Sequence, residues 1–222
     1  MQYDDNLYVA GQIGLVPHTM QIKGDSVVQE ARLSLQHVDS ILQAMKSDLN
    51  KLKSCVCYVT DNRYISTVKN VLVQNLEHFD EKKIIFIEVD ALPRQAKVEW
   101  QFVSKFGSED NMKVSFKNFA TDYDQNREKI AFKEAACHLF KTIKFGVEYR
   151  MKTQIKFFYV ANNTKVNYVD CLVQKYINEV FTEISIKPEV LSVPVKSLYY
   201  MNQPRHMMIC CHSICDLDND EF

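Results

Sequence analysis

Two stretches in the first half of the chain carry apolar residues at every third or fourth position, the spacing of one face of an α-helix. In the first stretch, over 25–48, they are Val28, Ala31, Leu35, Val38, Leu42 and Met45. In the second they are Ile65, Val68, Leu72, Leu76 and Phe79. Asp61 and Asn62 precede the second stretch, and both side chains favour helix N-termini. Each stretch therefore predicts an amphipathic helix with one buried face.

Runs of β-branched and aromatic residues around these helices predict strands. The runs occupy 7–10, 52–60, 84–89 and 97–105. A turn containing Pro93 separates the last two runs, which therefore read as neighbouring strands. The predicted order is strand, helix, strand, helix, strand, strand.

The same order of elements starts again in the second half. We expect strands at 112–119, 153–161, 191–195 and 206–211, and helices at 124–145 and 162–184. The segment "VCYVTDN" at 56–62 has its counterpart, "FFYVANN", about one hundred residues later, which indicates an internal duplication. The predicted fold class is α+β: two tandem domains, each a mixed sheet with two helices packed on one face. We expect domain 1 at 1–106, a linker at 107–111, domain 2 at 112–215 and an acidic tail at 216–222.

The composition of the chain argues against several classes of function, among them nucleic-acid binding and membrane association. The 222 residues are 46% hydrophobic and 25% charged with a formal net charge of −1, so no global field attracts nucleic acid or an anionic membrane. No apolar run approaches the roughly 20 residues that span a bilayer, and the N-terminus lacks the pattern of a signal peptide. An odd number of cysteines, seven, without framework spacing favours a reducing compartment. We expect a cytoplasmic protein that binds neither nucleic acid nor membrane.

Familiar chemical motifs are few. With five glycines, the chain has no glycine-rich phosphate loop, and it has no GxSxG or HExxH motif. Cys210, Cys211, His212 and Cys215 invite a zinc interpretation, but no second ligand pair is evident, so we expect no metal. Cys55 and Cys57 share one face of a predicted strand, where packing is the simpler role.

Three segments of the first half resemble the RidA (YjgF/UK114) family, whose members are also labelled endoribonuclease L-PSP-like. These segments are "LYVAGQIGL" (7–15), "VCYVTD" (56–61) and "IEVDALPRQAKVEWQ" (87–101). The second half resembles the family only in outline, through "FFYVANN" and "SVPVKSL" (192–198). The resemblance implies chorismate-mutase-like domains, the first of them without its usual opening strand.

One clear and one divergent RidA-like domain in tandem resemble the C-terminal region of long eukaryotic diphthine–ammonia ligases. In that family an N-terminal domain uses ATP and ammonium to amidate diphthine on translation elongation factor 2. No SGGKDS-like phosphate loop of that domain is present here. We therefore expect no cofactor in this chain, with ATP needed only by a ligase domain outside it.

The resemblance also implies a ligand cleft. Its candidate residues are Ala10, Gly11, Ile84, Phe86, Arg94 and Glu99. Glu99 matches the family's water-positioning glutamate, whereas Ile84 stands in place of the arginine that holds the substrate carboxylate, and Ala10 in place of a serine. Arg94 is either a displaced carboxylate binder or a solvated turn residue.

An apolar residue in place of that arginine argues against RidA-like deamination, because a charged bidentate contact is stronger than a neutral hydrogen bond. The sequence thus favours an accessory, non-catalytic role: self-association into a trimer or pseudo-trimer, or docking of a ligase ATP domain and translation elongation factor 2. Two alternatives stay open. One is a divergent enamine or imine deaminase that uses Glu99, and the other is a ligand-binding sensor.

Overall fold

The computed structural model describes residues 2–3, 6–22, 26–106, 115–121, 151–160, 171, 175, 189–201, 203–205 and 207–215. The chain divides into two compact units. The first comprises Met1–Glu109 with Tyr199–Pro204, and the second Asp110–Leu198 with Arg205–Phe222. Residues 199–204 belong to the first unit although they follow most of the second unit in the chain, which was not anticipated.

Two helices form in the first unit where the periodicity predicts them. Helix α1 spans Val27–Ala44 and begins at Ser26, whose Oγ accepts a hydrogen bond from the Val28 N–H at 3.2 Å. Helix α2 spans Ile65–Val73 and is shorter than its apolar pattern. Four 3₁₀ turns are also present among the described residues: η1 (Leu49–Lys51), η2 (Asn62–Tyr64), η3 (Glu81–Lys83) and η4 (Pro93–Gln95).

The sheet of the first unit has the strand order β1-β2-β7-β5-β6-β11-β12. Its strands are β1 (Gln2–Tyr3), β2 (Asn6–Ile13), β5 (Leu52–Val59), β6 (Ile84–Glu88), β7 (Val98–Lys105), β11 (Ser197–Tyr200) and β12 (Gln203–Arg205). Strand β5 runs parallel to β6 and antiparallel to β7, which is antiparallel to β2. A separate hairpin joins β3 (Leu15–Val16) and β4 (Gln21–Ile22). The mixed sheet confirms the α+β class.

The expectation of a missing first strand needs a correction. Strand β1 precedes β2 and pairs antiparallel with it, Gln2 opposite Leu7 and Tyr3 opposite Asn6. At two residues it is too short to produce a recognisable alternating pattern, which is why the sequence did not reveal it.

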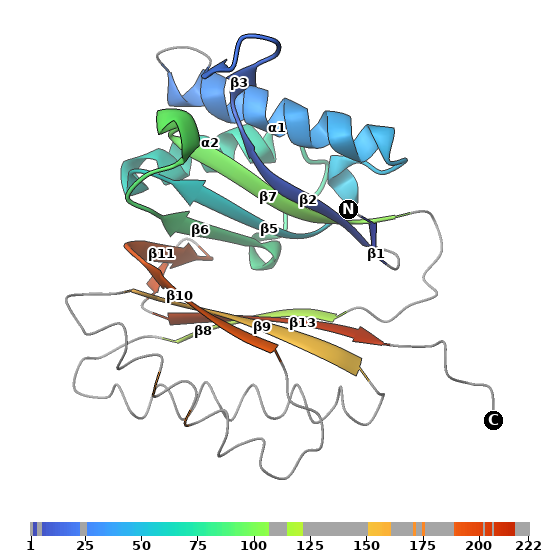
Figure 1. Ribbon diagram of the computed structural model, residues 1–222, viewed down its shortest axis with the longest axis vertical. Coiled ribbons are helices and arrows are strands. Elements are labelled where there is room, and N and C mark those ends of the chain that lie inside the picture. Colours follow the sequence, from blue (N-terminus) through green and yellow to red (C-terminus); the bar gives the residue numbers. More distant parts are fainter. Residues whose placement is uncertain are drawn as a thin grey trace. The chain divides into compact units, whose positions relative to one another are not determined.

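Helices α1 and α2 cover one face of the sheet (Figure 1). Residues alternate in burial along β5 and β7, so every second side chain enters the core beneath the helices. Trp100 and Phe102 are completely buried there, and Trp100 Nε1 donates to the Ala31 carbonyl at 3.2 Å. The intervening residues of β7, among them Glu99 and Gln101, lie on the opposite face.

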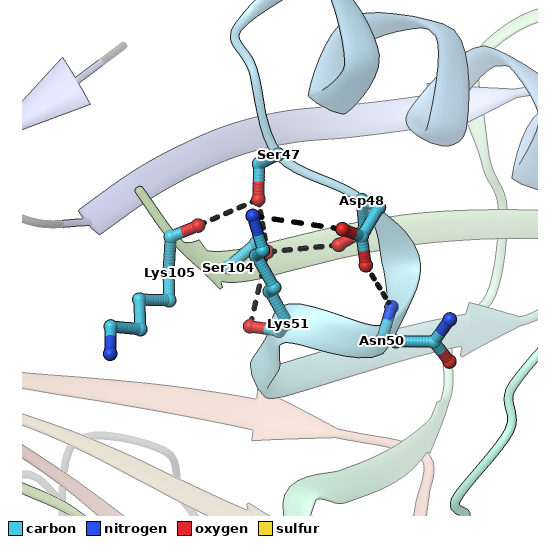
Figure 2. Close-up of polar contacts among 6 residues, drawn as sticks. All are labelled: Ser47, Asp48, Asn50, Lys51, Ser104 and Lys105. Carbon is cyan, nitrogen blue, oxygen red and sulfur yellow. Dashed lines mark hydrogen bonds and ion pairs between the residues drawn. The ribbon is translucent and has the colours of Figure 1, made fainter. Parts of the chain in front are cut away.

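A polar network closes one end of this layer (Figure 2). Ser104 Oγ lies 3.0 Å from Ser47 Oγ, and its single proton is shared between the carbonyl oxygens of Asp48 and Lys51, at 3.2 and 3.1 Å. Ser47 Oγ also donates to the Lys105 carbonyl at 2.6 Å. Ser47 and Ser104 are both buried, and their hydrogen bonds satisfy backbone carbonyls that would otherwise be costly to bury. The network joins the end of β7 to the chain between α1 and β5.

The second unit contains a four-stranded sheet in the order β10-β9-β13-β8. Its strands are β8 (Ser115–Thr121), β9 (Met151–Val160), β10 (Glu189–Val195) and β13 (Met207–Cys215). Strand β9 is parallel to β10 and antiparallel to β13, which is antiparallel to β8. This is the order and direction of β6-β5-β7-β2 in the first unit.

Other predictions for the second half lie outside the described residues. They concern the helices at 124–145 and 162–184, of which only Cys171 and Lys175 are described, both helical and exposed. The linker at 107–111 and the tail at 216–222 are likewise outside. Among the helices that the structure describes, none has the length and apolar character needed to span a membrane.

Candidate functional site

A β-bulge in β2 forms the first element of the candidate site. Val9 pairs with Phe102 and Gln12 pairs with Trp100, so two residues, Ala10 and Gly11, face one residue of β7. The Gln12 side chain donates through Nε2 to the carbonyls of Ala10 and Gly11, each at 3.1 Å. These bonds hold the bulge, a feature that often redirects side chains beside functional sites.

The carboxylate of Glu99 lies against the backbone of Gly11. A Cβ atom built on Gly11 would lie 1.6 Å from Glu99 Oε1 and 2.6 Å from its Cδ. No side chain fits at position 11 while Glu99 keeps this position. The structure thus brings together Gly11 and Glu99, two of the residues singled out in the sequence, with exposed Ala10 next in the chain.

The surroundings of Glu99 favour its protonated form. Partial burial of the carboxylate raises the pKa of Glu99 above its usual value of 4.5. Across the sheet Glu99 pairs with Tyr58, whose hydroxyl donates to Gln101 Oε1 at 3.3 Å. A carboxylate with a raised pKa is suited to accept or donate a proton, so this group is the strongest chemical candidate on this face.

Ile84 and Phe86 do not lie with Glu99, which corrects their assignment to the candidate cleft. They pair with Cys55 and Cys57 and are buried in the core beneath the helices. Because side chains alternate along a strand, Ile87, the partner of Tyr58, is the β6 residue on the Glu99 face. The resemblance matched Ile84 and Phe86 by position along the chain, which leaves open the face of the strand that each side chain occupies.

Arg94 lies in the η4 turn between β6 and β7. It is exposed and has a φ of 58°, in the left-handed region, as does Gln95 with a φ of 60°. An exposed guanidinium in a turn agrees with a solvated residue better than with a carboxylate binder.

Sequence reasoning missed Glu30, a buried carboxylate in the first turn of α1. Its Oε1 accepts hydrogen bonds from the backbone N–H groups of Lys97 and Val98, the latter at 3.0 Å. Glu30 therefore anchors the start of β7 directly before Glu99. Acidic residues are common in first helical turns, so no signal in the sequence distinguished this one.

Within the described part of the chain, no three His, Cys, Asp or Glu residues gather closely enough to hold an ion. Cys210, Cys211, His212 and Cys215 lie in β13, and their side chains are outside the described part. Cys55 and Cys57 are free and buried, and burial raises the pKa of both thiols. The two side chains therefore serve core packing.

Residues 1–105, nearly all of the first unit's N-terminal segment, match the model of the family described as Endoribonuclease L-PSP. The resemblance of this part of the chain to RidA proteins is therefore confirmed.

Diphthine–ammonia ligases are among the relatives of the chain. The enzyme of Schizosaccharomyces pombe is 35% identical over 98 residues, which cover 44% of this chain and 16% of the relative. That of Saccharomyces cerevisiae is 24% identical over 177 residues, covering 73% of this chain and 24% of the relative. The chain thus spans no more than a quarter of these ligases.

Deaminases match a shorter part of the chain. The mouse 2-iminobutanoate/2-iminopropanoate deaminase is 28% identical over 107 residues, 48% of this chain and 78% of the relative. Among solved structures, RidA from the Antarctic bacterium Psychrobacter is 23% identical with a TM-score of 0.45, covering 48% of this chain and 85% of its own.

Proposed function

We propose that this chain is the C-terminal accessory region of a diphthine–ammonia ligase, built from two RidA-type units of which the second is divergent. One observation carries the proposal: the match to the Saccharomyces cerevisiae ligase covers 73% of the chain, whereas that to the mouse deaminase covers 48%. The shared strand order of the two units supports an internal duplication.

The Glu99 face supports an accessory role in preference to imine hydrolysis. An amino-acid imine carries a carboxylate, and its recognition calls for a cationic or multiply donating partner. The residues paired with Glu99 are Ile13 and Tyr58, neither of them cationic, and Ile84 lies on the opposite face. We infer a cytoplasmic protein that serves assembly, in a trimeric or pseudo-trimeric arrangement, or docking of the ligase's ATP domain and of translation elongation factor 2.

Imine hydrolysis is tested by ammonia release from the purified chain, with imines generated in situ from several amino acids. A RidA-type deaminase is the positive control, and Glu99→Ala is the matched variant. We expect no release above the uncatalysed rate. Turnover by the unmodified chain that disappears in Glu99→Ala would establish an enzyme and end the accessory interpretation.

Docking is tested by biolayer interferometry with immobilised chain. Diphthine-bearing translation elongation factor 2 and the N-terminal part of a diphthine–ammonia ligase are the two analytes, and a RidA-type deaminase on the sensor is the control surface. We expect saturable binding of at least one analyte to the chain alone. Equal signals on both surfaces would contradict the docking role.

One observation favours a second candidate, a divergent imine hydrolase or ligand-binding sensor. Glu99 keeps the family's glutamate position, lies against a glycine backbone and has a raised pKa. Such a group is able to position a water molecule or bind a donor of a small ligand. The ammonia assay tests the hydrolase, and a calorimetric titration with amino acids tests the sensor.

A further inference from the structure

If one side of strand β6 were unpaired, the strand would be prone to pair with another chain. It begins with Ile84, Ile85, Phe86 and Ile87, an uncharged run of strand-forming residues, and all five of its residues are buried. An exposed edge strand of this composition pairs readily with another chain. One side of β6 pairs with β5, and the other side pairs with β11.

The strand that covers this edge comes from far along the chain, and it is anchored to the first unit by side chains. Tyr199 packs against the core of the first unit. Tyr200 is buried, and its hydroxyl donates to the carbonyl of Lys82, just before β6, at 3.4 Å. Backbone pairing and aromatic packing therefore both hold β11 at β6.

The outer strand of the hairpin is poorly suited to accept another strand. Strand β12 has three residues, of which Gln203 and Pro204 are exposed. Proline lacks the N–H group that a ladder needs, and short polar edges resist further pairing. At the opposite end of the sheet, β1 has only two residues. Both edge strands of the sheet are therefore too short to pair extensively with another chain.

We propose that the first unit's segment Tyr199–Pro204, defined as the edge cap, occupies a strand-accepting site at β6 and thereby prevents a second copy of this chain from pairing there. With the edge cap in place, the edge of the sheet is a short polar strand that contains Pro204. Without it, the edge would be the apolar strand β6, which could pair with another extended chain. This inference is independent of the proposed function, since it rests on the sheet order, the burial of β6 and the chemistry of β12.

The test uses the full chain and a variant with Tyr199→Pro and Tyr200→Pro. Neighbouring residues of a strand direct their N–H groups to opposite sides of the strand, so one of these two residues directs its N–H group toward β6. Replacing both tyrosines by proline therefore removes that N–H group, whichever residue carries it. Hydrogen exchange is measured at β6 amides, and association by sedimentation velocity over a range of concentrations. A matched control, Tyr199→Thr with Tyr200→Thr, keeps both N–H groups while removing the rings.

In the unmodified chain we expect slow exchange of β6 amides at every concentration. In the proline variant these amides exchange at least about tenfold faster when dilute, and the protein associates as concentration rises. The threonine control associates less than the proline variant. Fast exchange of β6 in the unmodified chain, or a folded proline variant with the same association state as the unmodified chain at every concentration, would overturn the proposal.

If the proline variant fails to fold, a second variant tests whether the edge cap prevents pairing with another chain. Pro204→Thr restores an N–H group on the exposed outer strand without touching the core. We expect it to fold and to associate at concentrations where the unmodified chain does not. The same sedimentation profile for both proteins would refute the role of the edge cap as the end of the sheet.

Discussion

At the scale of single residues, Gly11 and Glu99 depend on one another. The space that a side chain at position 11 would need is occupied by the Glu99 carboxylate, which is itself partly withdrawn from water. The glycine therefore permits a close approach between a side chain and the backbone of a bulged strand. Two effects are therefore expected at this pair: steric exclusion of a side chain at position 11, and a cost of burying the charged form of Glu99.

Gly11→Ala is expected to lower the free energy of unfolding by about 1 kcal/mol, because the new methyl group displaces the carboxylate from its position. The displaced atoms end a flexible side chain, so the fold persists. In a Glu99→Ala background the same change should cost almost nothing. Urea unfolding of the two single variants and the double variant measures this coupling. Equal costs in both backgrounds would show that the two residues do not interact.

The raised pKa of Glu99 predicts a dependence of stability on pH. Above that pKa the carboxylate is charged in both states, and its partial burial destabilises the folded state. As pH falls through the raised pKa toward 4.5, the folded state binds the proton first, so this destabilisation disappears.

Glu99→Gln should accordingly be more stable than the unmodified chain at neutral pH and no more stable below pH 4.5. Urea midpoints of both proteins across this range test the expectation, and an NMR titration of the Glu99 carboxyl carbon reports its pKa directly. A difference between the proteins that does not change with pH would rule out this electrostatic origin.

At the scale of elements, helix α1 and strand β7 are joined by hydrogen bonds that position the candidate site. Glu30 binds the N–H groups that begin β7, and Trp100 Nε1 binds the Ala31 carbonyl. Glu99 lies between these two attachments. The register of the strand, and with it the face that Glu99 occupies, thus depends on contacts with a helix distant in sequence.

Glu30→Ala is expected to destabilise the first unit by about 2–4 kcal/mol, since two backbone N–H groups near or within the core lose their acceptor. Glu30→Gln keeps an acceptor oxygen and should cost less than half as much. Gln36→Ala, an exposed change on the same helix, is the control and should be nearly neutral. Thermal unfolding measures all three; equal effects of Glu30→Ala and Gln36→Ala would show that Glu30 does not anchor β7.

At the scale of the whole molecule, positive and negative charges are nearly balanced, and strands far apart in the sequence pair within one sheet. The formal net charge is −1 at pH 7, and the isoelectric point calculated from the sequence is about 6.6. Strand β11 joins β6 although about one hundred residues separate them in the chain. Both properties bear on how the protein behaves in solution.

Solubility is expected to pass through a minimum at about pH 6–7, where the net charge crosses zero and repulsion between molecules is weakest. Precipitation by polyethylene glycol across pH 5 to 9 measures it, and electrophoretic mobility locates the point of zero charge. A solubility that is flat across this interval would indicate that surface patches, not net charge, control association.

The sequence by itself determined both helices of the first unit, its main strands and the resemblance of residues 1–105 to the RidA family, because these depend on local periodicity and on short motifs. It also singled out Gly11 and Glu99. Only the tertiary structure decided that Ile84 and Phe86 face the helices, since one residue of register moves a side chain to the other face. Glu30 and the edge cap were equally hidden from the sequence. Their partners, the start of β7 and the edge of β6, lie far away in the chain and are defined only when the sheet forms.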